Sequence, residues 1–149
     1  RSIEISKITE WALAPVVMLK KFPSTVVDVH INIIQADAGT RCAGINAASM
    51  ALAHAGIPMK NLVTSISLGK LDKDLVVDLD KAEEDWEEGE GATDIPISMT
   101  GDGKLTHIQL DGKINVKQLK EAIKLAKKSG SEIYEIQKQA LKDSVKEEK

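Results

Sequence analysis

A strand-like run that stops at a short polar turn is the feature that most constrains how this chain can fold. Residues 25–36 alternate apolar side chains, such as Val27, with polar ones, such as Asp28. A period of two predicts a strand. Residues 42–55, after the turn, are rich in Ala, Gly and Ser, and small side chains of this kind suit a helix that lies close against a sheet. Gly56 predicts the end of that helix.

The turn between the two predicted elements has the residues of an anion site. Thr40 is a predicted N-cap whose hydroxyl accepts a free backbone N–H, and Gly39 lets a ligand approach the backbone closely. Arg41 adds a guanidinium beside the positive end of the helix dipole, so the turn suits phosphate. The alternative is an ordinary helix cap with a surface arginine, because neither a phosphate-loop motif nor a complete dinucleotide fingerprint is present.

Composition excludes several classes of protein. The chain has 149 residues, a formal net charge of -3 and only 3% aromatic residues, which predicts an aliphatic core and does not indicate a nucleic-acid binder by bulk charge. The single cysteine, Cys42, excludes an internal disulfide framework and fits a reducing compartment, so we expect a cytoplasmic protein. The longest apolar run, residues 11–19, is too short to cross a membrane and is interrupted by Pro15.

Beyond residue 57 the pattern changes to short strands, tight turns and a long helix. Asn115 is the expected N-cap of that helix, and Gly130 is expected to loosen it. We therefore divide the chain into residues 1–57, a helix–strand–helix unit that is incomplete because one strand cannot form a sheet, and residues 58–149, an α+β unit of four strands and a helix. The predicted helices cover residues 2–21, 42–55 and 116 onward, and the predicted strands cover residues 25–36, 62–70, 74–79, 95–99 and 104–110.

Residues 78–94 are strongly acidic, with Lys81 as the only basic residue. Such a run is usually a solvated loop. The alternative is a site for a divalent cation, since Mg²⁺ takes carboxylate oxygens and shares its coordination with substrate phosphates. Asp94 is the strongest candidate, because it directly precedes the apolar strand 95–99 and would be held on a rigid element.

Together, and in this order, the two segments resemble the RNase PH superfamily, and most of all the catalytic RNase PH-like subunit of the archaeal exosome. The motif is Gln-Ala-Asp-Ala-Gly-Thr-Arg over residues 35–41, followed by Asp-Leu-Asp at 78–80, Glu-Asp at 84–85 and Thr-Asp-Ile-Pro at 93–96. The resemblance implies an RNase PH-like fold, in which β-α-β-α layers pack a mixed sheet on helices. It also implies that the first domain is truncated here, because the family has roughly a hundred further residues of strands before this point.

The resemblance also implies roles for individual residues. Those that match the family's phosphate site are Gly39, Thr40 and Arg41, and Arg1 resembles an upstream arginine that contacts RNA together with Arg41. The residues that match the family's catalytic and metal-associated aspartates are Asp85 and Asp94, with Mg²⁺ or Mn²⁺ as the cation. The stretch between these two aspartates is longer than is usual in the family, so Glu84 or Glu90 is an alternative to Asp85.

The implied reaction is processive 3′-to-5′ phosphorolysis of single-stranded RNA, with inorganic phosphate as co-substrate and nucleoside diphosphates as products. The implied assembly is a six-membered ring that alternates with a related non-catalytic subunit and carries RNA-binding cap proteins. A separately encoded N-terminal half is a further expected partner. The alternatives are a structural ring subunit that lacks activity and a phosphate- or nucleotide-binding module of another class.

Overall fold

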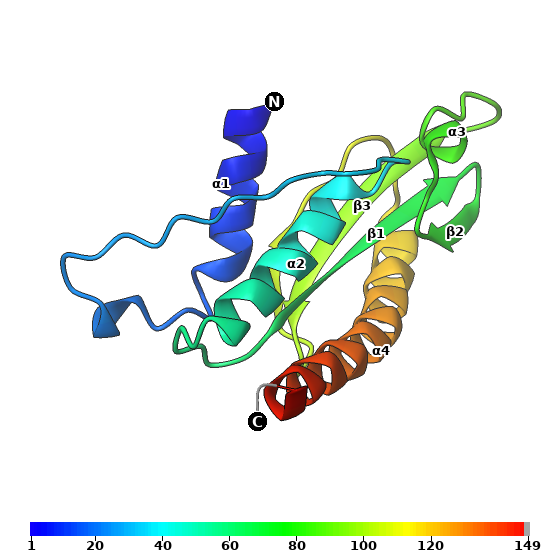
Figure 1. The fold of residues 1–149 in the computed structure, drawn as a ribbon. Helices are drawn as coiled ribbons and strands as arrows, with labels where there is room; N and C mark the ends of the chain where they lie inside the picture. The colour runs from blue at the N-terminus through cyan, green and yellow to red at the C-terminus, as the bar shows by residue number, and fades with distance from the viewer. Residues whose placement is uncertain (148–149) are drawn as a thin grey trace.

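A four-stranded antiparallel sheet with helices on both faces forms the body of the molecule (Figure 1). The computed structural model describes residues 1–147, so the last two residues of the predicted second unit lie outside the described residues. The strand order is β2-β1-β3-β4. The elements are α1 (Ser2–Leu13), the short 3-10 helix η1 (Leu19–Lys21), α2 (Thr40–His54), β1 (Val63–Leu71), β2 (Asp74–Val77), α3 (Lys81–Glu84), β3 (Ala92–Thr100), β4 (Leu105–Ile108) and α4 (Val116–Glu147).

The predicted α+β class, the four strands and the long C-terminal helix are confirmed. The sheet differs from the mixed sheet that we expected, because all the described strand pairs are antiparallel. The two long strands β1 and β3 lie at its centre and are buried along most of their length. Their register places Gly69 opposite Asp94, which fixes where the acidic segment returns to the sheet.

The two faces of the sheet have different chemistry. The face toward α4 is apolar, with Ile66 and Leu68 of β1 beside Ile95 and Ile97 of β3. The face toward α2 carries two small polar residues of β1, Ser65 and Ser67, and the Ser65 backbone donates to and accepts from the side chain of Asn46 in α2. Because small side chains line this face, α2 can lie close to the sheet, as its own small residues predicted.

The first helix is shorter than predicted. We expected a helix over residues 2–21, but α1 ends at Leu13. Pro15 explains the difference, because proline has no backbone N–H with which to continue the helical hydrogen bonds, although Ala14 before it still has helical backbone angles. Ile8, Ala12 and Leu13 still pack into the core formed with α2, so the predicted apolar face of α1 is correct.

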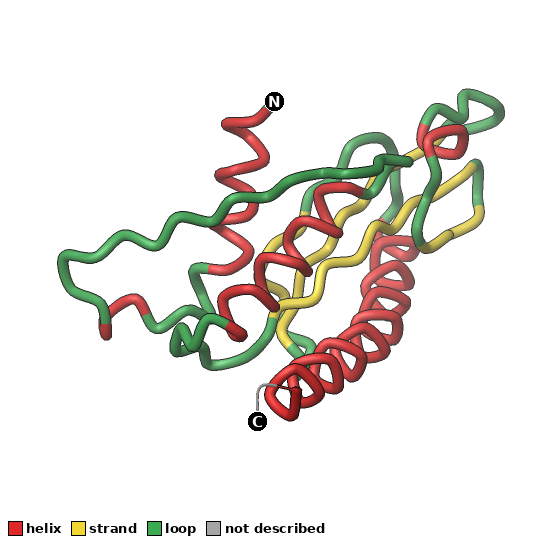
Figure 2. Tube along the Cα trace, viewed as in Figure 1, coloured by secondary structure: helices red, strands yellow, loops and turns green. Residues whose placement is uncertain are grey.

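The predicted strand over residues 25–36 does not form. Figure 2 shows this segment as a long loop that passes over α2 to reach its N-terminal end. Most of its apolar side chains are exposed, and Ile34 is 99% exposed. A single strand is unstable because its backbone N–H and C=O groups lack hydrogen-bond partners. Within the described residues no strand lies beside this segment to supply them. Ile31 alone is half-buried, against Gly44 of α2.

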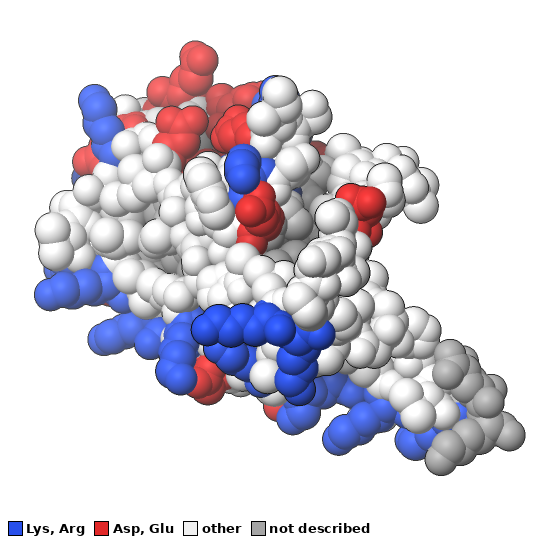
Figure 3. All heavy atoms as spheres, turned by 90° about the vertical axis from the view of Figure 1, so that its left-hand side faces the viewer, with Lys and Arg blue, Asp and Glu red and all other residues white. Residues whose placement is uncertain are grey.

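The last helix, α4, is continuous through Gly130, contrary to the expected loosening. Gly130 is buried where the helix touches the sheet, and a Cβ there would lie 3.0 Å from the sulfur of Met99 and 3.1 Å from Ile66. Glycine therefore brings α4 close to the sheet. The outer face of α4 carries many lysines, and Figure 3 shows basic residues gathered along the lower part of the molecule, with acidic residues gathered at the top.

Candidate functional site

Helix α2 begins at Thr40, two residues before the predicted start at residue 42, and its N-cap lies one residue before the predicted cap. Gly39 is the N-cap, with a φ of 60° in the left-handed region, and Thr40 is the first helical residue, so its hydroxyl is not the cap. The backbone N–H groups of Cys42 and Ala43 donate to the Gly39 carbonyl. The N–H groups of Thr40 and Arg41 precede any helical acceptor and can meet an anion. A Cβ at position 39 would lie 3.5 Å from that of Ser67, so β1 closes in beside the turn.

Arg41 is held in place by a residue from the far edge of the sheet. Its Nη1 donates to the side-chain oxygen of Gln109, which follows β4. Its Nε is buried, and within the described residues it has no hydrogen-bond partner. A buried guanidinium N–H without an acceptor is unusual, because leaving such a group unpaired costs about 1–3 kcal/mol. An anionic ligand at this turn would satisfy it.

Asp94 points from β3 toward the same turn. Its backbone exchanges two hydrogen bonds with Asp111, at 2.8 and 2.9 Å, which fix its position. Burial raises the pKa of the Asp94 carboxyl above its ordinary value. The Arg41 guanidinium opposes this rise in pKa, whereas the carboxylates of Glu84 and Asp111 add to it. The side chain is therefore better able than an ordinary aspartate to hold a proton near neutral pH.

Two consecutive acidic residues at the end of the short helix α3, Glu84 and Asp85, have different surroundings. Lys81 pairs with both, but Glu84 lines the pocket that also contains Asp94, whereas the Asp85 side chain is 63% exposed and does not line it. The start of α3 is anchored to the anion turn, because the Lys81 backbone N–H donates to a carboxylate oxygen of Asp37 at 3.0 Å. Glu90, the other sequence alternative to Asp85, pairs with Lys70 instead.

These residues meet in a pocket of about 230 Å³. Five of the six residues proposed from the sequence line it, and Asp85 does not. Sequence reasoning missed Lys81, Ser67 and Gln109 as neighbours of the site. Gln109 lies 68 residues from Arg41 in the sequence, so no local pattern could have predicted their contact. The predicted residues in the lining are Arg1, Gly39, Thr40, Arg41 and Asp94, joined by Glu84.

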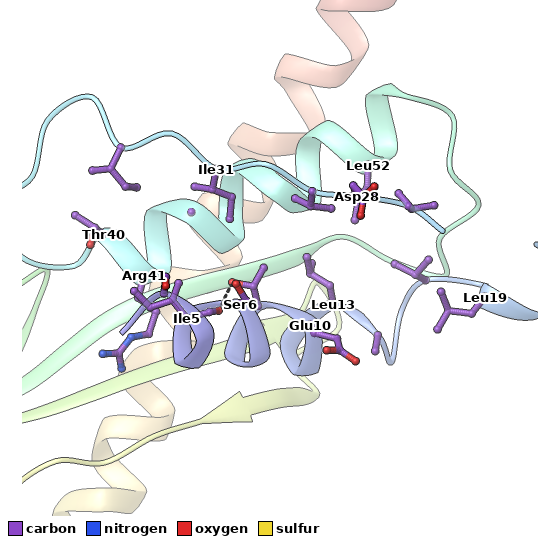
Figure 4. A pocket seen from close by; sticks show the side chains of 18 residues that line it. Ile5, Ser6, Glu10, Leu13, Leu19, Asp28, Ile31, Thr40, Arg41 and Leu52 are labelled. Carbon is purple, nitrogen blue, oxygen red and sulfur yellow. Dashed lines mark hydrogen bonds between the residues drawn. The ribbon is translucent and has the colours of Figure 1, made fainter. Parts of the chain in front are cut away.

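A larger apolar groove, of about 720 Å³, lies between α1 and residues 27–33. Figure 4 shows Ile5 and Leu13 of α1 on one side of it and Ile31 on the other, with Thr40 and Arg41 near one end. Its lining offers few groups for chemistry, whereas the smaller pocket combines basic and acidic side chains. We therefore assign the candidate site to the smaller pocket.

The pocket offers oxygen ligands for a cation but not a complete set. Within residues 1–147 no cluster of three or more metal-binding side chains occurs. Three carboxylates line the pocket; that of Asp37 accepts the Lys81 backbone N–H at the start of α3, which leaves those of Glu84 and Asp94 as the two candidate ligands. This number suits Mg²⁺, which is often bound by one or two carboxylates and completes its coordination with water and substrate phosphates. Burial raises the pKa of the Cys42 thiol, which also lines the pocket, to about 11, so little of it is the nucleophilic thiolate near neutral pH.

Two family models match successive parts of the chain. The model described as 3′ exoribonuclease family, domain 1, matches residues 1–58, and the model for domain 2 of the same family matches residues 61–129. The chain belongs to this family, the RNase PH family, as its sequence motifs indicated.

Among known proteins, the chain is similar to the exosome complex component Rrp41 of Methanosarcina mazei, with 49% identity over 142 residues that make up 95% of this chain and 28% of that protein. It is 46% identical to Rrp41 of Thermococcus gammatolerans over 96% of this chain and 56% of that protein. The chain thus spans about half the length of such relatives or less. The solved structure of rice Rrp46 shares the fold, with a TM-score of 0.82 over 93% of this chain and 64% of that one, at 23% identity.

None of the helices within residues 1–147 is both long enough and apolar enough to cross a membrane.

Proposed function

We propose that this chain carries the phosphate-binding and acid-base part of an exosome-type phosphorolytic 3′-to-5′ exoribonuclease. One observation carries the proposal: Arg41, whose buried Nε lacks a partner in the described part of the chain, shares a pocket with Asp94, whose pKa is raised. An anion-binding group beside a protonatable carboxyl is what transfer of a nucleotide from RNA to phosphate requires.

In this mechanism the helix N-terminus and Arg41 hold inorganic phosphate. A phosphate oxygen attacks the phosphorus of the last phosphodiester of the RNA, and the bond from that phosphorus to the 3′ oxygen of the preceding nucleotide breaks. A nucleoside diphosphate forms, and the leaving oxygen takes a proton from Asp94. The raised pKa of Asp94 supports this role, because a higher pKa increases the fraction of the carboxyl that holds a proton at a given pH.

A divalent cation, Mg²⁺ or Mn²⁺, would neutralise charge on the phosphates when bound. The family resemblance assigns it to Asp85 and Asp94, and the pocket lining supports Glu84 in place of Asp85. The two assignments make opposite predictions. If Glu84 is the ligand, Glu84→Gln raises the Mg²⁺ concentration needed for half-maximal activity and Asp85→Asn does not; if Asp85 is the ligand, the effects are reversed.

We further propose that the chain acts in the cytoplasm, in a hexameric ring with a related non-catalytic subunit and RNA-binding cap proteins, on single-stranded RNA that Arg1 and Arg41 contact. The names of its relatives, exosome components, support this assembly. The residues that the relatives have and this chain lacks would come from a longer polypeptide or from a separately encoded half. A structural ring subunit without activity is the second candidate, favoured by the exposed position of Asp85.

The test is the Asp94→Asn variant in the preparation in which the unmodified chain is active. Asparagine keeps the shape of the side chain but cannot supply the proton. We expect phosphorolysis to fall at least a hundredfold, at the low end of what general acid catalysis contributes, about 10²–10⁴-fold, while RNA binding stays within twofold. Asp74→Asn, which removes a carboxylate at the start of β2, is the matched control. Equal turnover in Asp94→Asn would exclude the catalytic role.

A further inference from the structure

Lys70 is a buried cation outside the pocket. It lies on β1, on the same face as Ile66 and Leu68, and its residue exposure is 0%. Burying a lysine in an apolar layer is unfavourable unless the ammonium group is paired and hydrogen-bonded. The hydrogen-bond partners of the Lys70 ammonium group therefore identify the two segments of the chain that this residue holds together.

Lys70 joins the turn after β1 to the acidic loop before β3. Its Nζ donates to the Asp72 carbonyl at 2.8 Å and to the Glu90 carboxylate at 2.7 Å. The same two segments share backbone contacts, because Glu90 N–H donates to a carboxylate oxygen of Asp72 at 3.2 Å and Asp72 N–H donates to the Gly91 carbonyl at 3.1 Å. A Cβ at Gly89 would lie 2.5 Å from that Asp72 oxygen, so the loop lies tightly on the turn.

This loop connects two of the three carboxylates that line the pocket, those of Glu84 and Asp94. It leaves α3 directly after Glu84 and re-enters the sheet two residues before Asp94, at Ala92. The start of α3 is held by Asp37, whereas the far end of the loop is held by Lys70. The Ala92 N–H donates to the Trp86 carbonyl at 2.8 Å, which closes the base of the loop, so Lys70 adds the anchor of its outer part, and loss of that anchor would loosen the connection between Glu84 and Asp94.

We propose that Lys70 is a positioning residue: through Glu90 it holds the loop 85–91 against the β1–β2 turn and thereby fixes the spacing of Glu84 and Asp94 across the pocket. This inference rests on the proposed function, since the spacing matters for binding a cation between the two carboxylates. Lys70 itself touches neither substrate nor cation. Its effect should therefore appear in cation dependence and not in the use of phosphate.

The first experiment measures the loop without relying on activity. Hydrogen exchange at the amides of Asp72 and Glu90 is compared in the unmodified chain, Lys70→Met and Glu90→Ala. Methionine fills the apolar site of Lys70 without its charge, so we expect the fold to be retained. We expect at least tenfold faster exchange in both variants. The control is Glu88→Ala, which removes a carboxylate from the same loop but not the one that Lys70 holds, and which should leave exchange unchanged.

A fluorescence measurement covers the case in which Lys70→Met does not fold. Trp86 lies in the loop, and Trp11→Phe leaves it as the only tryptophan of the chain. In that background Glu90→Ala should shift the Trp86 emission to longer wavelength as the loop leaves the turn. Glu90→Gln retains an oxygen that can accept from Lys70 and should restore most of the original emission. Unchanged emission in Glu90→Ala would overturn the proposal.

The second experiment measures phosphorolysis against Mg²⁺ concentration. We expect the half-saturating Mg²⁺ concentration to rise about tenfold in Lys70→Met and Glu90→Ala, at the low end for residues that orient metal ligands, with the KM for phosphate within twofold. Faster exchange with an unchanged Mg²⁺ requirement would refute the positioning role and leave only a structural anchor.

If Asp94→Asn were fully active, the proposed function would fail, and faster exchange would then show a docked loop with no role in that reaction.

Discussion

At the scale of the residue, the proposed phosphorolysis depends on how the side chains of Arg41 and Asp94 are held in the pocket. Both could be predicted from the sequence, because each lies in a short motif at the junction of a turn and a regular element. Their supports could not be predicted, since Gln109 is brought to Arg41 only by the pairing of β3 with β4. The choice between Glu84 and Asp85 was also open. Consecutive residues at the end of α3 point in different directions, and only coordinates show which faces the pocket.

Replacement of Arg41 by alanine should weaken the use of phosphate. The variant loses hydrogen bonds to a charged ligand, each of which contributes about 1.5–3 kcal/mol, so the KM for phosphate should rise by at least about tenfold. Initial rates over a series of phosphate concentrations measure this. Lys7→Ala, which breaks an exposed ion pair on α1, is the control. An unchanged dependence on phosphate would refute the anion site.

The raised pKa of Asp94 predicts a pH-dependent stability difference. A carboxyl whose pKa is raised on folding favours the folded state below its unfolded pKa, and this contribution is lost as the pH rises through the folded value. Asp94→Asn cannot ionise, so it should be more stable than the unmodified chain at pH 7, and the difference should shrink as the pH falls toward 3.8, the ordinary pKa. Urea unfolding at several pH values tests the sign. The prediction would be contradicted if the unfolding free energy of Asp94→Asn minus that of the unmodified chain were smaller at pH 7 than at pH 4.

At the scale of the element, the strands and helices from residue 40 onward were predictable because each carries its own period and its own turn residues. Elements whose state depends on a distant neighbour were not. The segment over residues 25–36 has a clear strand period, yet it stays unpaired because no strand lies beside it in the described chain. Gly69 shows the same limit, since its role depends on Leu79, which packs over the site where β1 lies opposite Asp94.

Gly69→Ala should destabilise the fold through Leu79. A Cβ at position 69 would lie 2.0 Å from a Leu79 methyl group, and Leu79 is buried, so the leucine must move. Overpacking of this kind costs about 1–3 kcal/mol of unfolding free energy. Leu79→Ala removes the three nearest atoms, so adding Gly69→Ala in that background should cost little. Urea unfolding of the two single variants and the double variant measures the coupling. Additive effects would show that the two residues do not meet.

At the scale of the whole molecule, an apolar groove and an unpaired segment lie on one side of an otherwise well-packed fold. The groove of about 720 Å³ runs beside residues 27–33, and several apolar side chains of that segment are exposed. The relatives are about twice as long or longer. The exposed apolar side chains of this segment and the groove beside it therefore lie together on one side of the molecule.

Backbone amides over residues 26–34 should therefore exchange with solvent at nearly the rate of an unfolded chain. They have no ladder of hydrogen bonds to protect them, whereas amides inside α2 should be protected at least a thousandfold under the same conditions. Hydrogen exchange read by mass spectrometry on peptides from both regions makes the comparison internal to one sample. Equal protection in the two regions would mean that the segment is paired in solution.

Phosphorolysis at the Arg41–Asp94 pocket can be tested by identifying the nucleotide that is released from an oligoadenylate RNA in the presence of Mg²⁺. The assay uses the chain with the partners its activity requires, with and without inorganic phosphate. We predict adenosine diphosphate, formed only when phosphate is present and lost in Asp94→Asn. Release of adenosine monophosphate without phosphate would instead show hydrolysis by water. That result, or the absence of any product from a fully assembled ring, would contradict a phosphorolytic site built on Arg41 and Asp94.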